Sequence, residues 1–127
     1  MANHRIFTAF AIEDKWARDY FVGQAKNDKS PFEFVNMSVN EPWDEKWKTQ
    51  CRTRIKGCDG MIAIVSKNTK NATGALWEIK TAKEERVPVR GIYATTDDRP
   101  VVLPAELANV KVVTWSWPNI KAFLDSL

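Results

Sequence analysis

The chain has 127 residues, which is the usual size of one domain. Hydrophobic residues make up 44% of the chain and charged residues 28%, so its composition excludes a disordered or collagen-like protein. The net charge of +3 comes from basic residues spread along the whole chain, which argues against a nucleic-acid-binding surface. We therefore expect a single domain over residues 1–127 and no nucleic-acid partner.

Short apolar runs alternate with longer amphipathic ones along the chain. Strands are expected at residues 5–10, 32–36, 60–65, 87–94 and 110–114. Helices are expected between and after them, at residues 13–26, 43–55, 75–86 and 120–127, with a short turn or helix at 103–107. The run 60–65 is apolar almost throughout, which is typical of a central strand covered on both faces.

Two of the expected helices carry a clear apolar stripe. Residues spaced by about four form the stripe of the second helix: Trp43, Trp47, Cys51, Ile55 and Cys58. In the third, Leu76, Ile79 and Ala82 share one face, so we expect that face to be buried.

The alternation of strands and helices predicts an α/β fold. It favours a flavodoxin-like three-layer sandwich, in which a five-stranded parallel sheet of order 2-1-3-4-5 has helices on both faces. Ligands of such sheets bind outside the carboxyl ends of the strands. Here that edge gathers residues near Phe10, 36–38, 66–69 and 93–95.

Several kinds of site are not expected. His4 is the only histidine and precedes the first strand, which argues against a Ser-His or Cys-His dyad. Cys51 and Cys58 lack a second ligand pair, so we expect two small buried hydrophobes and no metal. The chain also lacks the glycine-rich phosphate-binding motifs, and no cofactor is expected.

A phosphoacceptor receiver domain is also excluded. That family needs an aspartate at the end of the third strand, where this chain has Ser66 and Lys67. The acidic pair after the first strand, Glu13 and Asp14, is interpreted as capping a helix.

The sequence predicts a cytoplasmic protein that has no contact with a membrane. Its longest strongly apolar run, at 61–65, is too short to cross a bilayer, and no apolar signal region is visible at the N-terminus. Two cysteines are too few for a disulfide scaffold.

Glu78 is the candidate for chemistry, because it follows the loop that leaves the expected central strand. One interpretation is a surface glutamate favoured near a helix N-terminus by the macrodipole. The adjacent Trp77 favours a site instead, since an aromatic side chain at the ligand edge can stack on a flat ring.

At these residues the chain resembles TIR-like domains, in particular the short prokaryotic branch that includes the TIR proteins of Thoeris anti-phage defence. The resemblance covers residues 5–95. It rests on five segments in order: 5–14, 34–38, 43–55, 58–69 and 76–82. The last, with Trp77, Glu78, Ile79 and Ala82, is the most specific. The branch usually has an aspartate where Asn36 stands.

The resemblance implies cleavage of NAD at the nicotinamide–ribose bond, with NAD as substrate and Glu78 as the catalytic residue. It also implies release of ADP-ribose or a cyclic ADP-ribose-type signal, in anti-phage defence, and self-association. Phe10 is expected beside the nicotinamide ring, Ser38 and Ser66 at ribose or phosphate, and Asn36 and Trp77 among the substrate-binding residues. The product would reach a separate effector protein.

Two other functions stay open at this stage. Many TIR-like domains are adaptors that bind other proteins and catalyse nothing. A third possibility is a receptor that binds an ADP-ribose derivative without converting it.

Overall fold

In this computed structural model the described residues are 4–11, 14, 16–20, 23, 32–35, 45–95 and 103–127. They include five strands that form one sheet, in which every neighbouring pair is parallel. The sheet order is β2-β1-β3-β4-β5. The bounds are β1 (His4–Ala9), β2 (Phe32–Val35), β3 (Gly60–Val65), β4 (Val89–Tyr93) and β5 (Lys111–Val113). The expected α/β class, with β3 in the middle of a parallel sheet, is confirmed.

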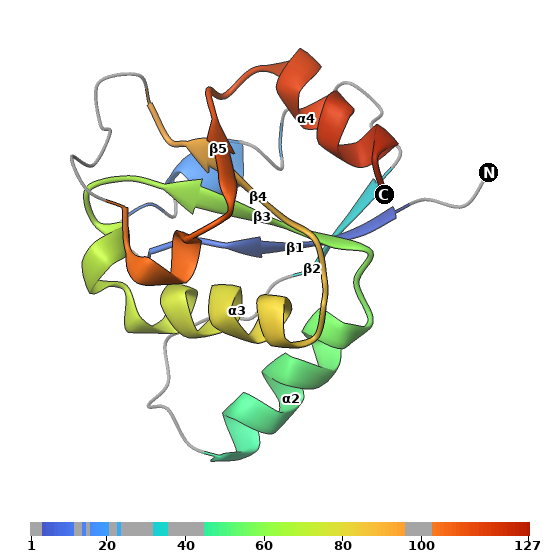
Figure 1. Cartoon of the computed structure of the whole chain (residues 1–127), viewed down its shortest axis with the longest axis vertical. Helices are drawn as coiled ribbons and strands as arrows, with labels where there is room; N and C mark the ends of the chain where they lie inside the picture. Colours follow the sequence, from blue (N-terminus) through green and yellow to red (C-terminus); the bar gives the residue numbers. More distant parts are fainter. Residues whose placement is uncertain are drawn as a thin grey trace.

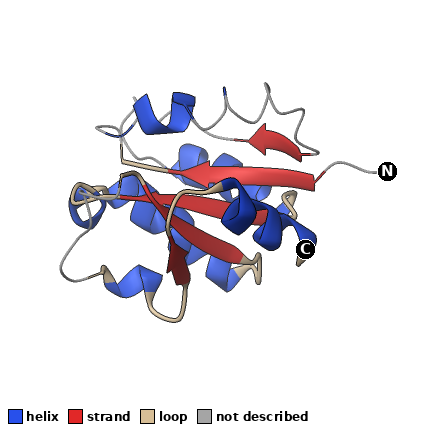
Figure 2. Cartoon of the chain, turned by 90° about the horizontal axis from the view of Figure 1, so that it is seen from above, coloured by secondary structure: helices blue, strands red, loops and turns tan. Residues whose placement is uncertain are grey.

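Helices cover both faces of the sheet (Figures 1 and 2). On one face lie α2 (Glu45–Lys56) and α3 (Thr73–Glu84), and on the other lies α4 (Trp117–Asp125). Residues 16–20 are also helical, and 3-10 turns include η2 (Thr69–Asn71) and η3 (Ala105–Leu107). Within the described part of the chain, no helix is long and apolar enough to span a bilayer.

The central strand β3 joins two hydrophobic clusters. All six of its residues are buried, and successive side chains point to opposite faces. Met61, Ala63 and Val65 pack with residues of α2 and α3, whereas Ile62 and Ile64 pack with residues of α4. Both faces of the strand are therefore desolvated, which explains why its sequence does not alternate with polar residues.

Both boundaries of α3 and of α4 differ from those expected, and each helix ends two residues early, at Glu84 and Asp125. The last helix begins at Trp117 instead of residue 120, because the Ser116 side chain accepts a hydrogen bond from the Asn119 backbone N–H and caps it. The third helix begins at Thr73, two residues early, directly after η2. Trp43 and half of the expected helix at 13–26 lie outside the described residues.

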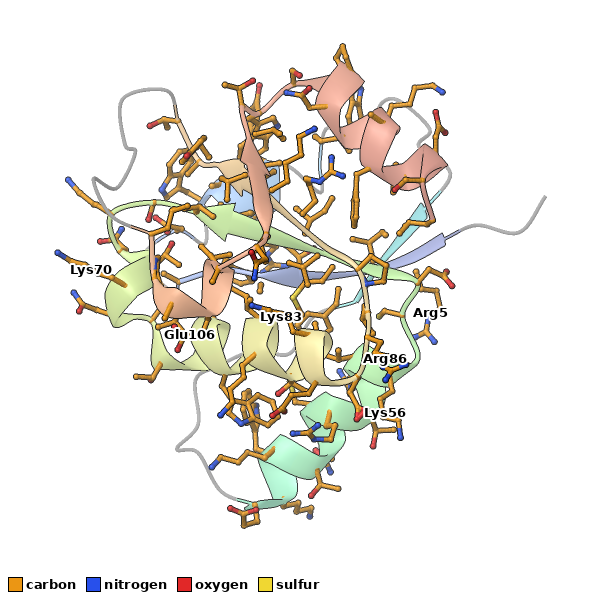
Figure 3. The ribbon with its side chains drawn as sticks, viewed as in Figure 1. Arg5, Lys56, Lys70, Lys83, Arg86 and Glu106 are labelled. Atoms are coloured by element: carbon orange, nitrogen blue, oxygen red, sulfur yellow. The ribbon has the colours of Figure 1, made fainter. Side chains whose placement is uncertain are left out.

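The carboxyl-terminal end of α3 is fixed to the segment that follows β4. Lys83 Nζ donates to the backbone oxygens of Glu106 and Ala108, at 3.2 and 2.8 Å. Figure 3 shows Lys83 on α3 beside the segment that carries Glu106. The helix that carries Glu78 is thus held at this end as well as by its packing on the sheet.

Candidate functional site

Glu78 lies in the second turn of α3, on the face that the helix buries. Its side chain is 2% exposed, and its buried neighbours on the helix include Ala75, Ile79 and Ala82. The interpretation of Glu78 as a solvent-exposed surface residue is therefore wrong. A buried carboxyl group is costly unless it is neutral or compensated, so its surroundings decide its charge.

The carboxyl group of Glu78 accepts a hydrogen bond from a thiol of the neighbouring helix. Cys51 Sγ on α2 donates to Oε2 at 3.6 Å, and no other hydrogen bond to Glu78 is present among the described residues. A carboxylate offers roughly four acceptor positions, so most of this capacity is unused. Burial raises the pKa of the Glu78 carboxyl to about 8, and the Cys51 hydrogen bond offsets only part of this rise.

Cys51 remains a protonated donor. Burial raises the pKa of its thiol well above the usual range, and the nearby Glu78 carboxylate raises it further, while Arg54 acts in the opposite direction. Its side chain is fully buried, with Trp47 and Ile55 one turn away on the same face of α2. The expectation that Cys51 is buried is confirmed, but it is more than a small hydrophobe because it contacts the candidate catalytic carboxyl group.

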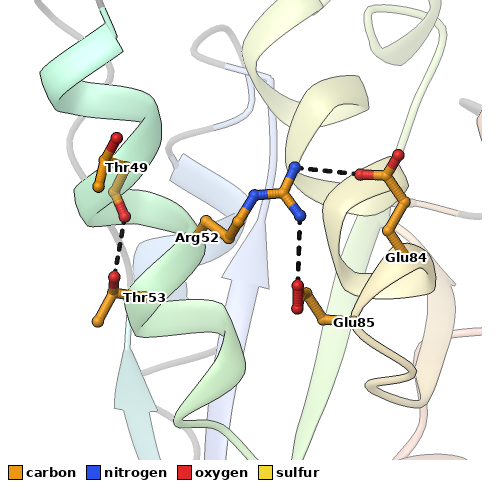
Figure 4. Close-up of polar contacts among 5 residues, drawn as sticks. All are labelled: Thr49, Arg52, Thr53, Glu84 and Glu85. Carbon is orange, nitrogen blue, oxygen red and sulfur yellow. Dashed lines mark hydrogen bonds and ion pairs between the residues drawn. The ribbon is translucent and has the colours of Figure 1, made fainter.

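Ion pairs also join α2 to α3. Arg52 on α2 reaches both Glu84 and Glu85 at the end of α3, at 3.1 and 3.4 Å (Figure 4). These pairs are partly exposed, and such ion pairs contribute little individually, about 0–1 kcal/mol each. They nevertheless join α2 to the carboxyl-terminal end of α3.

Trp77 lies in the same interface and is half-buried. Its ring packs against Trp47 of α2, with centroids 5.5 Å apart and planes inclined by 51°. The Arg52 guanidinium carbon lies 5.8 Å from the Trp77 ring centroid. In this structure Trp77 therefore stacks on residues of the protein itself.

A second buried carboxylate lies at the carboxyl edge of the sheet. The Asp14 side chain, 1% exposed, accepts hydrogen bonds from Ser66 Oγ at 2.5 Å and Asn68 Nδ2 at 3.1 Å. The Ser66 hydroxyl in turn accepts from the Asn68 backbone N–H at 3.0 Å. The Thr69 hydroxyl accepts from the Ser66 backbone N–H at 2.9 Å. This network fixes the connection between β3 and α3.

The structure brings some of the expected site residues together. Phe10 follows β1 and Ser66 follows the adjacent β3, so both lie at the carboxyl edge of the sheet. Phe10 is half-buried, with the Arg18 guanidinium carbon 5.2 Å from its ring centroid. Ser66 is fully buried and its hydroxyl is engaged with Asp14, so a contact with ribose or phosphate would require that network to open. Asn36 and Ser38 lie outside the described residues.

Sequence reasoning missed the roles of Asp14 and Cys51. The signal for Asp14 was present, because an acidic residue after the first strand and polar residues after the third meet at one edge of the expected sheet. The interpretation of Asp14 as a helix cap missed this, since its carboxylate bonds to Ser66 and Asn68. No local pattern pairs Cys51 with a residue 27 positions away.

Comparisons with known proteins agree with this fold. A family model described as Thoeris protein ThsB, TIR-like domain, matches residues 7–99. Among solved structures, the chain is similar to the TIR domains of the activated Roq1 resistosome directly recognizing the pathogen effector XopQ. The TM-score is 0.52 at 18% identity, over 72% of this chain and 57% of that one. The chain thus spans less than two thirds of that relative. No curated protein matches the chain.

The fold and the matched residues define a TIR-like domain. The family model covers most of the chain, so the chain belongs to the Thoeris ThsB TIR-like family. The similarity to the Roq1 TIR domains supports the fold alone, given the low identity.

The raised pKa of Glu78 predicts how stability depends on pH. Between pH about 4.5 and about 8 the native state keeps a proton that the unfolded chain releases, so stability is lost as pH rises through this window. Glu78→Gln lacks this loss. As the pH rises from 4.5 to 8, we expect the unfolding free energy of Glu78→Gln to increase relative to that of the parent. The expected gain is up to about 4 kcal/mol.

Urea unfolding at several pH values measures this difference. The buried amide that the substitution introduces adds an offset that does not depend on pH, so the change with pH is the relevant quantity. The exposed Glu45 serves as the control, and Glu45→Gln should show no comparable trend. Parallel pH curves for Glu78→Gln and the parent would contradict the assignment of a neutral buried carboxyl group.

Proposed function

We propose that this protein cleaves NAD at the nicotinamide–ribose bond, with Glu78 as the catalytic residue. One observation carries the proposal: α3 holds a carboxyl group inside the fold with most of its hydrogen-bonding capacity unused by the described residues. Family membership supports a TIR-type role in defence or signalling, within which NAD cleavage is the activity that employs such a carboxylate.

The chemistry suits a single carboxylate. Nicotinamide is a cationic leaving group and leaves without being protonated. The transition state resembles an oxocarbenium ion, so positive charge develops on the ribose. The ionised Glu78 would stabilise that charge and accept hydrogen bonds from the ribose hydroxyls, which fill the acceptor positions that the protein leaves open. Water, or an atom of the same nucleotide, then attacks the anomeric carbon to give ADP-ribose or a cyclic product.

In this proposal the conformation described above is the resting one. Glu78 is 2% exposed, so a ribose can contact it only after the surrounding side chains move. With a pKa of about 8 the buried carboxyl group is mostly neutral at pH 7, and a neutral carboxyl group cannot offset an oxocarbenium charge. Opening of the site by movement of the side chains around Oε1, with the Cys51 contact at Oε2 kept, would hydrate Glu78, lower its pKa toward the usual range and restore its charge.

Self-association is the event that we propose for this opening. Two large aromatic side chains of the helical residues 16–20 are solvent-exposed, Trp16 by 55% and Tyr20 by 60%. They are four residues apart and therefore lie on one face of the helix. Aromatic residues are enriched at protein interfaces, which makes this face the proposed contact. A separate effector protein would respond to the product.

The catalytic role predicts that Glu78→Gln abolishes NAD cleavage. Gln keeps the shape and removes the charge, and loss of one such electrostatic contact typically costs about 10²–10³ in rate. The rate of the parent should rise with pH toward 8, since more of Glu78 is then ionised. Chromatography of released nicotinamide from concentrated protein measures both effects.

Glu45→Gln is again the matched control, because it makes the same change at an exposed position on α2 and should keep the parent rate. Equal rates for folded Glu78→Gln and the parent would show that Glu78 is not the catalytic residue. If the parent never releases nicotinamide but binds an ADP-ribose derivative, the domain is a receptor. If it does neither and only self-associates, it is an adaptor.

The proposed contact predicts that turnover per molecule rises with protein concentration. Trp16→Ala should abolish this rise and reduce the apparent mass in light scattering, because it removes the most exposed tryptophan described. Lys70→Ala, at an exposed position in η2, is the control. A strict monomer whose turnover per molecule is independent of concentration would contradict the proposed assembly.

A further inference from the structure

Cys51 is a buried polar group for which neither the fold nor the proposed reaction gives a reason. A fully buried position on α2 between Trp47 and Ile55 would accept an alanine or a valine. Instead the chain has a thiol there, and it is the one described group that donates a hydrogen bond to the Glu78 carboxyl. The hydrogen bond is made to Oε2.

We propose that Cys51 is a positioning residue, whose thiol holds Oε2 of Glu78 and leaves Oε1 as the oxygen that meets the ribose. The catalytic part of this proposal rests on the proposed function. The effect of Cys51 on the Glu78 carboxyl group can be tested without substrate. Cys51 touches no substrate in this account and acts through Glu78.

The geometry gives the thiol a defined place from which to act. The helix that carries Cys51, α2, is joined to α3 by the ion pairs of Arg52 with Glu84 and Glu85. The packing of Trp47 on Trp77 also joins them. The 3.6 Å separation joins two side chains that are both at most 2% exposed, so no bulk water competes for the bond. A thiol is a weak hydrogen-bond donor. Its hydrogen bond would therefore orient the carboxyl group without binding it strongly.

Few other described charges act on this pair. From the sheet, Phe7, Ala9, Met61 and Ala63 contribute apolar side chains to the cluster that contains Cys51. From α2, Arg54 acts on the Cys51 thiol, and Arg52 is engaged at the outer side with Glu84 and Glu85 of α3. The hydrogen bond from Cys51 is therefore the main described contact that favours the ionised form of Glu78.

The test compares Cys51→Ala with Cys51→Ser. Both remove the sulfur, but only serine keeps a donor, so their difference isolates the hydrogen bond from the loss of volume. Cys58 is the matched control: it is also a buried thiol, but it donates to the Arg54 backbone oxygen at 3.3 Å. Cys58→Ala and Cys58→Ser should leave Glu78 unaffected.

The first readout needs no catalysis. Carbon NMR of the Glu78 carboxyl in the whole chain, assigned by its absence in Glu78→Gln, follows the titration of this group. We expect Cys51→Ala to raise the pKa of Glu78 by roughly one pH unit and Cys51→Ser to restore it. An unchanged pKa in Cys51→Ala, or equal pKa values in the Ala and Ser variants, would overturn the positioning role.

The second readout is the pH profile of nicotinamide release. In Cys51→Ala the rising limb should move to higher pH and kcat should fall with KM unchanged, while Cys51→Ser should recover both. If the parent releases no nicotinamide, the proposed function fails, and the NMR titration still decides whether Cys51 positions Glu78. A fall in kcat that is the same in the Cys58 variants would also overturn the proposal.

Discussion

The burial of one carboxyl group, that of Glu78, is the constraint on which the rest of this structure depends. Placing it between α2 and α3 removes it from water, which costs free energy unless the group stays protonated. A single thiol hydrogen bond offsets part of that cost. The α2–α3 interface must therefore be held by other contacts, and the tryptophan pair and the Arg52 ion pairs lie around it. The opening of the site proposed above would relieve this cost.

The two buried carboxyl groups have opposite roles because their surroundings differ. Asp14 accepts two hydrogen bonds from side chains of the β3–α3 connection, and these bonds compensate its burial. It fixes the loop from which α3 begins. Glu78 has one weak donor and a raised pKa. Many active sites pair a satisfied carboxylate that supports the site with an unsatisfied one that reacts, and the proposed function gives Glu78 the second role.

Much of the fold could be predicted from the sequence, but the environment of Glu78 could not. The apolar run 60–65 defines the central strand, and the spacing of Trp47, Cys51 and Ile55 defines the buried stripe of α2, because both patterns are local. In α3, the pattern analysis expected Leu76, Ile79 and Ala82 inside, whereas Leu76 is only half-buried and Glu78 lies deep. Pattern rules place charged residues outside, so they fail where a carboxyl group is buried. The Cys51–Glu78 contact arises only when two helices pack together.

Binding of an uncleavable carbocyclic analogue of NAD tests the account most directly, if the carboxyl carbon of Glu78 is followed by NMR at pH 7. The account predicts that saturation with the analogue moves this signal from its protonated to its ionised position, because the ribose hydroxyls and the cationic ring stabilise the carboxylate. A Glu78 signal that keeps its position and its titration near pH 8 while the analogue is fully bound would contradict it.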